Sequence, residues 1–338
     1  MKTIMRVGVD LSKNVFVVYG VDERDQSVVK RTLKRAELLS FFAQLEPSLV
    51  GMEAGSGAHH WARELLKLGH DARIMDPRLV APYRSQGRTG KNDANDAQAI
   101  CEAVGRPHMR FVPIKDPEQQ AILLIHRVRK GIVNEQNRIA NQLRGLLAEF
   151  GVVMPQGLES LKRVWSNTRQ RYADAVPVLA WSEFDRLYAR LGELHAEILR
   201  YDRRINAHVR TDVRARRLTE IHGVGPITAS AIVATIGNGR DFKNGRQFAA
   251  WLGLTPKQFS TGGRTILGKI TKRGDTYLRT LLIHGGRSEL MYVHRREDPK
   301  SQWATRLRET KPWNKAAVAL ANKHARMIWS ILAKEQFA

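Results

Sequence analysis

The sequence predicts a mixed α/β domain followed by two mainly helical regions. Three observations lead to this fold class. Short apolar runs with strand-like alternation fill the first third of the chain, and long helical patterns without internal proline fill the middle. Shorter helical stretches interrupted by glycine fill the last third. Strands that alternate with helices are typical of a sheet covered by helices, so we expect domains over 1–115, 116–212 and 213–338.

The composition indicates a nucleic-acid partner. Lys and Arg number 56 against 33 Asp and Glu, which gives a formal charge of +23. An excess of this size favours binding to a polyanion. No apolar run approaches the roughly 18 to 20 residues of a membrane span, and no signal-peptide core is evident. We therefore expect a cytoplasmic, nucleoid-associated protein without a membrane partner, and the single cysteine excludes a multi-cysteine zinc site.

The first domain is predicted element by element from its periodicity. Alternating valines indicate buried strands, and apolar residues three and four apart indicate helices. The predicted elements are strands over 5–18 (interrupted at 10–14) and 27–33, a helix over 37–45, a strand over 49–53, a helix over 61–68 and a strand over 72–75.

Four carboxylates stand where such a fold places a site. Asp10 and Glu53 each lie where a strand runs out into a loop, and ligand sites of open α/β sheets gather at strand ends. Asp93 and Asp96 are three residues apart at a predicted helix start, so they share one helix face. Clustered acids stay ionised only beside cations, and oxygen ligands favour Mg²⁺ or Mn²⁺. Such ions activate nucleophiles and stabilise leaving oxygens in phosphoryl transfer.

Simpler structural roles stay open for these acids. Asp10 is also a suitable turn residue, and Asp93 a suitable helix N-cap with Asp96 in the first turn. Glu53 is harder to explain in this way, because it follows the apolar run at residues 49–52 and has no stabilising role there.

The acids lie in motifs that resemble a known family. The stretches Val7-Gly-Val-Asp-Leu-Ser-Lys13, Gly51-Met-Glu-Ala-Gly-Ser-Gly57 and Lys91-Asn-Asp-Ala-Asn-Asp-Ala97 resemble the three motifs of the RuvC-like (RNase H-like) DEDD domain of insertion-sequence family one-ten, whose transposases are related to the Piv DNA invertases. The resemblance implies that Asp10, Glu53, Asp93 and Asp96 bind the divalent metal.

The middle region is predicted to be a helical coiled-coil spacer. One long helix is expected over 118–150, and from Phe184 to Ile205 apolar residues recur alternately three and four apart. This seam can pack on the helix of 118–150 within one chain, as an antiparallel hairpin, or partly on a partner chain. We therefore expect a homo-oligomer, a dimer or a tetramer.

The last third begins with the pattern of a helix-hairpin-helix over 218–232. Gly223 and Gly225 allow a tight turn whose amides, with the next helix N-terminus, face a phosphate. Two helices packed for stability alone are the alternative. Further helices are predicted from Asp275 and over 315–334.

The stretch 256–275 combines hydroxyls, glycines and cations. Ser260 and Thr261 precede two glycines, which let the backbone approach a ligand closely. The residues expected to contact nucleic acid in this stretch are Thr261, Gly262, Gly263, Arg264, Lys269, Lys272 and Arg273. A hydroxyl held there against a phosphodiester is a candidate nucleophile, and a turn that only grips phosphates is the alternative.

This region resembles the transposase domain of the same family. The runs Phe248-Ala-Ala-Trp-Leu-Gly-Leu-Thr-Pro256, Ser260-Thr-Gly-Gly-Arg264 and Gly268-Lys-Ile-Thr-Lys-Arg-Gly-Asp-Thr-Tyr-Leu-Arg279 carry the resemblance. It implies a serine nucleophile that becomes covalently linked to DNA, which we assign to Ser260, with Thr261 as the alternative one residue on. It also implies a structured noncoding RNA that pairs with donor and target DNA.

The sequence thus predicts a transposase or site-specific recombinase that exchanges DNA strands through a covalent serine intermediate assisted by Mg²⁺. Two other functions stay open. In a metal-dependent nuclease or junction resolvase, water attacks and Ser260 only grips phosphate. In a non-catalytic DNA-bridging protein, neither Asp10 nor Glu53 affects any activity.

Overall fold

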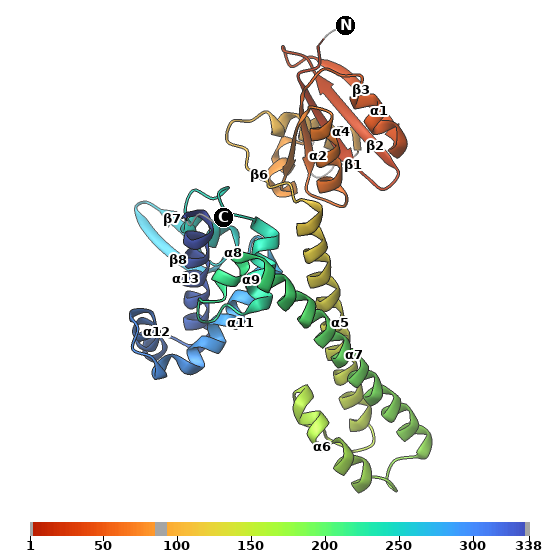
Figure 1. Cartoon of the computed structure of the whole chain (residues 1–338), viewed down its shortest axis with the longest axis vertical. Coiled ribbons are helices and arrows are strands. Elements are labelled where there is room, and N and C mark those ends of the chain that lie inside the picture. The colour runs from red at the N-terminus through yellow and green to blue at the C-terminus, as the bar shows by residue number, and fades with distance from the viewer. Residues whose placement is uncertain (1–2, 85–92, 335–338) are drawn as a thin grey trace. The chain divides into compact units, whose positions relative to one another are not determined.

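The computed structural model describes residues 3–84 and 93–334. They belong to two compact units, Met1–Pro117 and Glu118–Ala338 (Figure 1). The first unit is a mixed α/β domain and the second is mainly helical, which confirms the predicted fold class at this level.

A six-stranded mixed sheet forms the centre of the first unit. Its strands are β1 (Arg6–Leu11), β2 (Val15–Val21), β3 (Ser27–Lys34), β4 (Leu49–Glu53), β5 (Asp71–Met75) and β6 (Phe111–Val112), in the order β3-β2-β1-β4-β5-β6. Strands β1, β4 and β5 are parallel to one another, and the other pairs are antiparallel. The predicted strand over 5–18 is a hairpin of two strands, because residues 12–14 form its turn.

Helices cover both faces of this sheet. They are η1 (Arg35–Glu37), α1 (Leu38–Phe42), α2 (Ala58–Lys67), α3 (Pro77–Val80), η2 (Ala81–Tyr83) and α4 (Asp93–Val104). Val7, Val9 and Trp61 belong to a core with α1 and α2 on one face, whereas Ile100 and Val104 of α4 lie in a second core on the other. Strand residues alternate between the two faces, so residues of β1 and β4 that lie an even number of positions from Gly8 and Gly51 face α4.

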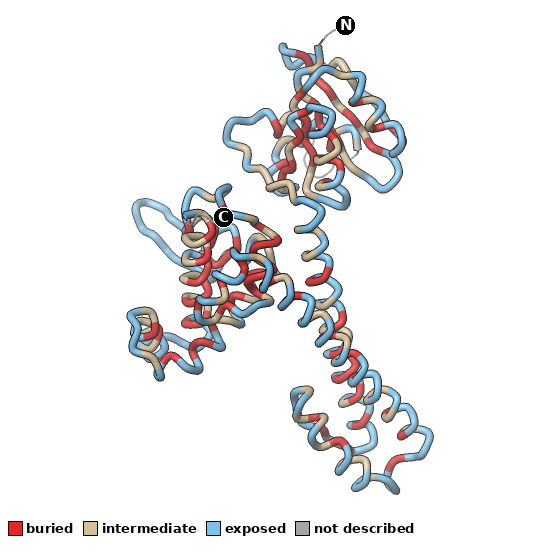
Figure 2. The backbone as a smooth tube through the Cα atoms, viewed as in Figure 1, coloured by how far each residue is buried: buried red, intermediate tan, exposed pale blue. Residues whose placement is uncertain are grey.

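The second unit begins with an antiparallel helical hairpin. It contains α5 (Pro117–Ala148), α6 (Leu158–Arg171) and α7 (Val178–Thr211). The predicted seam of α7 packs against α5 of the same chain, where Arg129 pairs with Asp202 and Gln136 donates to the Leu191 carbonyl. Figure 2 shows buried residues where the two helices run together.

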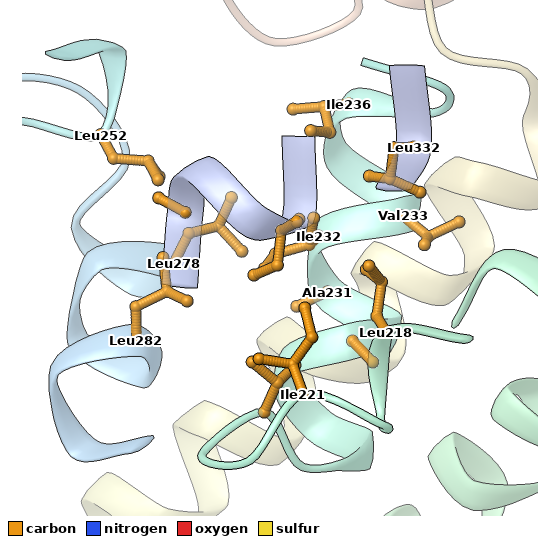
Figure 3. Close-up of a cluster of buried hydrophobic side chains, with 14 of the residues drawn as sticks. Leu218, Ile221, Ala231, Ile232, Val233, Ile236, Leu252, Leu278, Leu282 and Leu332 are labelled. Carbon is orange, nitrogen blue, oxygen red and sulfur yellow. The ribbon is translucent and has the colours of Figure 1, made fainter. Parts of the chain in front are cut away.

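A compact bundle of shorter helices follows. It comprises α8 (Val213–Leu218), α9 (Pro226–Ile236), α10 (Gly245–Trp251), α11 (Thr276–Tyr292), η3 (Val293–Arg295), α12 (Pro299–Thr310) and α13 (Trp313–Lys334). Apolar side chains of α8, α9, α11 and α13 converge in one core, which includes Leu218, Ile232, Leu278 and Leu332 (Figure 3). Burial of such side chains, each contributing about 1.5–3 kcal/mol, stabilises the bundle.

The stretch that carries Ser260 is a β-hairpin. Strands β7 (Pro256–Thr261) and β8 (Arg264–Ile270) form a two-stranded sheet, in a stretch for which no strand was predicted. All its residues except the half-buried Ile270 are exposed, as Figure 2 shows. With no buried face, the strands lack the apolar alternation by which the other strands were predicted.

Candidate active site

Two of the predicted acids lie at the ends of adjacent parallel strands. Asp10 is the second-to-last residue of β1, and Glu53 is the last residue of β4. The register pairs Gly8 with Gly51 and Val9 with Met52. One residue further along this register, Asp10 and Glu53 lie on neighbouring strands at the same edge of the sheet.

Two glycines define which face these acids occupy. A Cβ atom built on Gly8 would lie 2.2 Å from the Ala97 carbonyl oxygen of α4, and one built on Gly51 would lie 2.7 Å from Cβ of Val104. Both glycines therefore face α4, whose backbone lies directly on β1. Because side chains two residues apart point to the same face, Asp10 and Glu53 also point to the α4 side.

Helix α4 brings Asp96 to this side. It begins at Asp93, whose side chain lies outside the described residues, and Asp96 follows one turn later. Asp96 is buried, with 7% of its surface exposed. Asp10 and Glu53 thus lie at strand ends and Asp96 in the first turns of α4, and their role as a joint site stays a prediction.

An arginine that the sequence analysis missed bridges two of these acids. Arg84, directly after η2, donates from Nε to Asp96 Oδ1 at 2.5 Å and from Nη2 to Glu53 Oε1 at 3.4 Å. The Arg84 and Glu53 side chains are only 22% and 21% exposed. The guanidinium therefore neutralises carboxylates that would otherwise repel one another. Nothing in the local sequence distinguishes Arg84 from the other arginines.

The chemistry of this acid cluster fits a divalent cation. In the part of the chain that the structure describes, no group of three or more His, Cys, Asp and Glu side chains is arranged to hold a metal ion. The fit rests instead on position and charge. Glu53 of β4 and Asp96 of α4 share the Arg84 guanidinium at the strand ends, and the neighbouring end of β1 carries Asp10.

The candidate nucleophile lies on the β7–β8 hairpin. Gly262 and Gly263 have φ angles of 52° and 78°, so they form the two-residue turn that hairpins favour, in which both central residues have positive φ. Ser260 is exposed, and its Oγ accepts a hydrogen bond from Gln258 Nε2 at 2.8 Å. The glycines predicted to contact nucleic acid thus have a structural role as the turn.

Ser260 and Thr261 point to opposite faces of this hairpin, because successive strand residues alternate. Ser260 lies opposite Thr265, and Thr261 lies opposite Arg264. The two candidate hydroxyls therefore have different surroundings although they are neighbours in sequence. All four predicted cations of this stretch are exposed, and none forms an ion pair within the described residues (Arg264, Lys269, Lys272 and Arg273).

Comparison with known proteins identifies the family. A model described as "Transposase IS116/IS110/IS902 family" matches residues 215–302, and a model of the DEDD transposases of IS110 elements matches residues 7–152. A "probable family 20 transposase" of Pseudomonas aeruginosa is 47% identical over 333 residues, which cover 98% of both chains.

The chain belongs to this family of insertion-sequence transposases. Two further relatives agree. The transposase for insertion sequence element IS1111A of Coxiella burnetii is 37% identical over 99% of this chain and 92% of its own length. The transposase for IS1328 of Yersinia enterocolitica is 35% identical over 98% and 97%. The family resemblance found in the motifs is therefore confirmed.

The matched ranges contain both parts of the candidate site. The first range spans the four acids and the second spans the β7–β8 hairpin with Ser260. No helix within the described part of this transposase is long and apolar enough to cross a membrane.

The predicted helix-hairpin-helix corresponds to α8 and α9 of the transposase. Gly223 has a φ of 87°, and a Cβ atom there would lie 2.6 Å from His324 Cε1 and 2.9 Å from the Gly285 carbonyl. Close packing on α11 and α13 thus explains Gly223. Gly225, the N-cap of α9, is exposed and has open space around it. Phosphate binding at this turn stays a prediction.

Proposed function

We propose that this transposase exchanges DNA strands through a covalent serine–DNA intermediate. Ser260 is the nucleophile, and Asp10, Glu53, Asp93 and Asp96 are the ligands of Mg²⁺ or Mn²⁺. The observation that carries the proposal is that Arg84 bridges Glu53 of β4 and Asp96 of α4, beside the end of β1 that carries Asp10. When bound, the metal supplies Lewis-acid polarisation of the phosphoryl group.

The positions of Glu53 and Asp96 support this role for the acids. Glu53 ends a strand whose preceding residues are buried and apolar, so its charge adds nothing to the core. Asp96 is buried with one cationic partner, an arrangement that costs desolvation free energy on folding. An arrangement that costs stability and gathers charge at a strand edge is typical of a functional site. In this proposal Arg84 holds Glu53 and Asp96 in place for the metal.

The role of Ser260 follows from its exposure and its hydrogen bond. Gln258 donates to Ser260 Oγ, so the amide orients the hydroxyl without taking its proton. In the attack, Oγ forms a bond to phosphorus, and the bond from phosphorus to the leaving sugar oxygen breaks. The serine proton passes to solvent, and the leaving oxygen takes up a proton. The phosphoserine ester retains the energy of the phosphodiester, so a sugar hydroxyl can rejoin the strand by the reverse attack.

The hairpin that carries Ser260 is suited to contact a nucleic acid. An isolated two-stranded ribbon is marginally stable in water. This one exposes Phe259, Ile266 and Leu267 at 60%, 54% and 63%, beside cations that form no ion pair within residues 3–84 and 93–334. Apolar groups and cations on one exposed ribbon favour a partner with both flat apolar surfaces and phosphates, such as DNA or RNA.

Trapping of a covalent adduct tests the proposal. The purified protein is incubated with Mg²⁺, the termini of the element and flanking noncoding RNA, and the products are separated on a denaturing gel. We expect an adduct that is absent in Ser260→Ala and in Asp10→Asn but present in Thr261→Ala. Thr261 is a matched control because it is the adjacent hydroxyl on the opposite face of the same strand.

The other outcomes identify the alternatives. Loss of the adduct only in Thr261→Ala would assign the nucleophile to Thr261. Metal-dependent cleavage without an adduct in any variant would indicate a nuclease or junction resolvase in which water attacks. An Asp10→Asn protein with full activity and no metal requirement would indicate a DNA-bridging protein.

The partners of the reaction remain part of the proposal. We propose that element ends and target DNA are the substrates, that a noncoding RNA guides their pairing, and that the transposase acts as a dimer or tetramer. The charge of +23 supports the binding of two kinds of nucleic acid. Omission of the RNA from the adduct assay tests its role directly.

A further inference from the structure

A deep groove lies in the helical bundle, away from the turn of the β7–β8 hairpin. Residues of α10, α11, α12 and α13 line it, together with the base of the hairpin, and its volume is about 1440 Å³. The cavity is thus large enough for several nucleotide-sized groups. All of its lining residues belong to the second unit.

The groove is strongly basic. Seven lining residues are Lys or Arg and none is Asp or Glu. Two of the seven, Lys269 and Lys272, come from the hairpin region, and Arg246, Arg287 and Arg326 are exposed on helices. Within the described residues, none of the seven forms an ion pair. Because unneutralised like charges repel one another, such a groove is most stable when a polyanion occupies it.

The floor of the groove is apolar. Leu254, Ile283, Val318 and Met327 line it, and the apolar part extends to the ring of Trp303. The Lys323 ammonium lies over this ring, 4.5 Å from its centroid. An aromatic ring with a cation beside it is typical of sites for unpaired bases, where a base takes the place of the ammonium on the ring, whereas a duplex buries its base faces in its own stack.

The polar groups of the groove already have partners. Asn322 donates to the Leu254 carbonyl at 3.3 Å, Asn314 accepts from Arg287 at 3.0 Å, and Asn244 caps α10 by accepting from the Gln247 amide. Amides with these partners are poorly placed to read base edges. Recognition in this groove therefore depends on charge and stacking, which every base can satisfy.

We propose that this groove binds an unpaired segment of nucleic acid without sequence preference, with phosphates on the cationic rim and bases on the apolar floor. The segment is either displaced single-stranded DNA or a single-stranded part of an RNA, and the two share this chemistry. The proposal deepens the proposed function, since a strand-exchanging transposase produces unpaired strands, but it requires neither the metal nor Ser260.

Binding of labelled oligonucleotides tests the rim. The anisotropy of fluorescent oligothymidine, oligouridine and a blunt duplex of equal length is titrated with the full chain in EDTA. Lys315→Gln/Arg326→Gln removes two rim cations, and Arg306→Gln/Lys311→Gln removes two exposed cations outside the groove. We expect the rim variant to lose at least about tenfold in single-strand affinity, and its salt slope to fall by about 1.4, or about 0.7 for each lost contact.

A second variant tests the floor. Trp303→Leu keeps an apolar side chain but removes the stacking ring, so we expect about tenfold weaker binding of oligothymidine with an unchanged salt slope. An abasic oligonucleotide should bind weakly to the original chain and respond little to this change. Because the abasic comparison uses the unaltered protein, it remains informative if Trp303→Leu folds poorly.

The remaining outcomes are decisive. Preference for oligouridine over oligothymidine would assign the groove to RNA, and the reverse would assign it to DNA. Equal losses in the two double variants, or equal affinity for the blunt duplex, would overturn the proposal. Normal binding by the rim variant, with adduct formation still dependent on Ser260, would overturn the groove alone and leave the proposed function intact.

Discussion

Replacement of Arg84 by Gln should destabilise the first unit in the absence of metal. The change removes the cation between Glu53 and Asp96 and leaves the Asp96 carboxylate, whose side chain is 9% exposed, without its charged partner. Loss of one member of a buried ion pair costs about 3–5 kcal/mol. Arg84 is 22% exposed, so water can replace part of the interaction. We therefore expect a loss of about 2 kcal/mol.

Hydrogen exchange measured by mass spectrometry reports this loss locally. In EDTA, peptides of β1, β4 and α4 should exchange faster in Arg84→Gln than in the original chain. Excess Mg²⁺ should restore protection more in the variant, because there the ion neutralises carboxylates whose charge Arg84 already balances in the original chain.

Arg78→Gln is the matched control for this experiment. Arg78 pairs with Asp76 in the same unit, but its side chain is 60% exposed. Exposed pairs contribute about 0–1 kcal/mol, so we expect little change there. If Arg84→Gln were no more damaging than Arg78→Gln, or if Mg²⁺ protected both equally, the carboxylates would not form a cation site.

Three further predictions follow from buried groups. Gly8→Ala places Cβ 2.2 Å from the Ala97 carbonyl, so we expect a loss of about 3 kcal/mol in urea unfolding, whereas Gly145→Ala, in open space on α5, should be neutral or stabilising. Burial, helped by Arg129, lowers the pKa of His126 to about 4. As the pH falls, the unfolded chain therefore takes up the His126 proton before the folded chain does. The free energy of unfolding should fall by about 2 kcal/mol between about pH 7.5 and about pH 5. Urea midpoints measured across this pH range should show that His126→Gln removes the dependence. Lys300→Met removes the Lys300 ammonium from buried Glu289, which keeps His324 as a partner, and should lower the thermal midpoint of the second unit more than Lys311→Met does.

The strands of the first unit and the long helices were predictable because their buried apolar residues recur at regular spacing. Alternating valines define β1 and β2, and the three-four spacing of α7 defines its contact with α5. The placement of Asp10 and Glu53 at adjacent strand ends follows from the same patterns.

Other features depend on contacts between segments distant in sequence. The β7–β8 hairpin buries almost nothing, so its residues carry no alternation that could predict strands. Arg84 bridges acids that lie 31 and 12 residues away, and its local sequence has no special feature. The groove gathers cations from three helices and the hairpin region, each of which alone resembles a solvated basic surface.

One shared spacing links the fold of the first unit to its acids. Gly8-Val9-Asp10 and Gly51-Met52-Glu53 both place a glycine two residues before the acid, and the glycines are register partners. Residues two apart in a strand share a face. Each glycine therefore packs under α4, and the acid two residues later lies on the same face at the end of the strand. Because glycine has no side chain, the α4 backbone can lie directly on β1. This close packing brings Asp96 to the ends of the strands that carry Asp10 and Glu53. A larger residue at either glycine would move α4 and separate its acids from those of the sheet, so the glycines position the site although they touch no ligand.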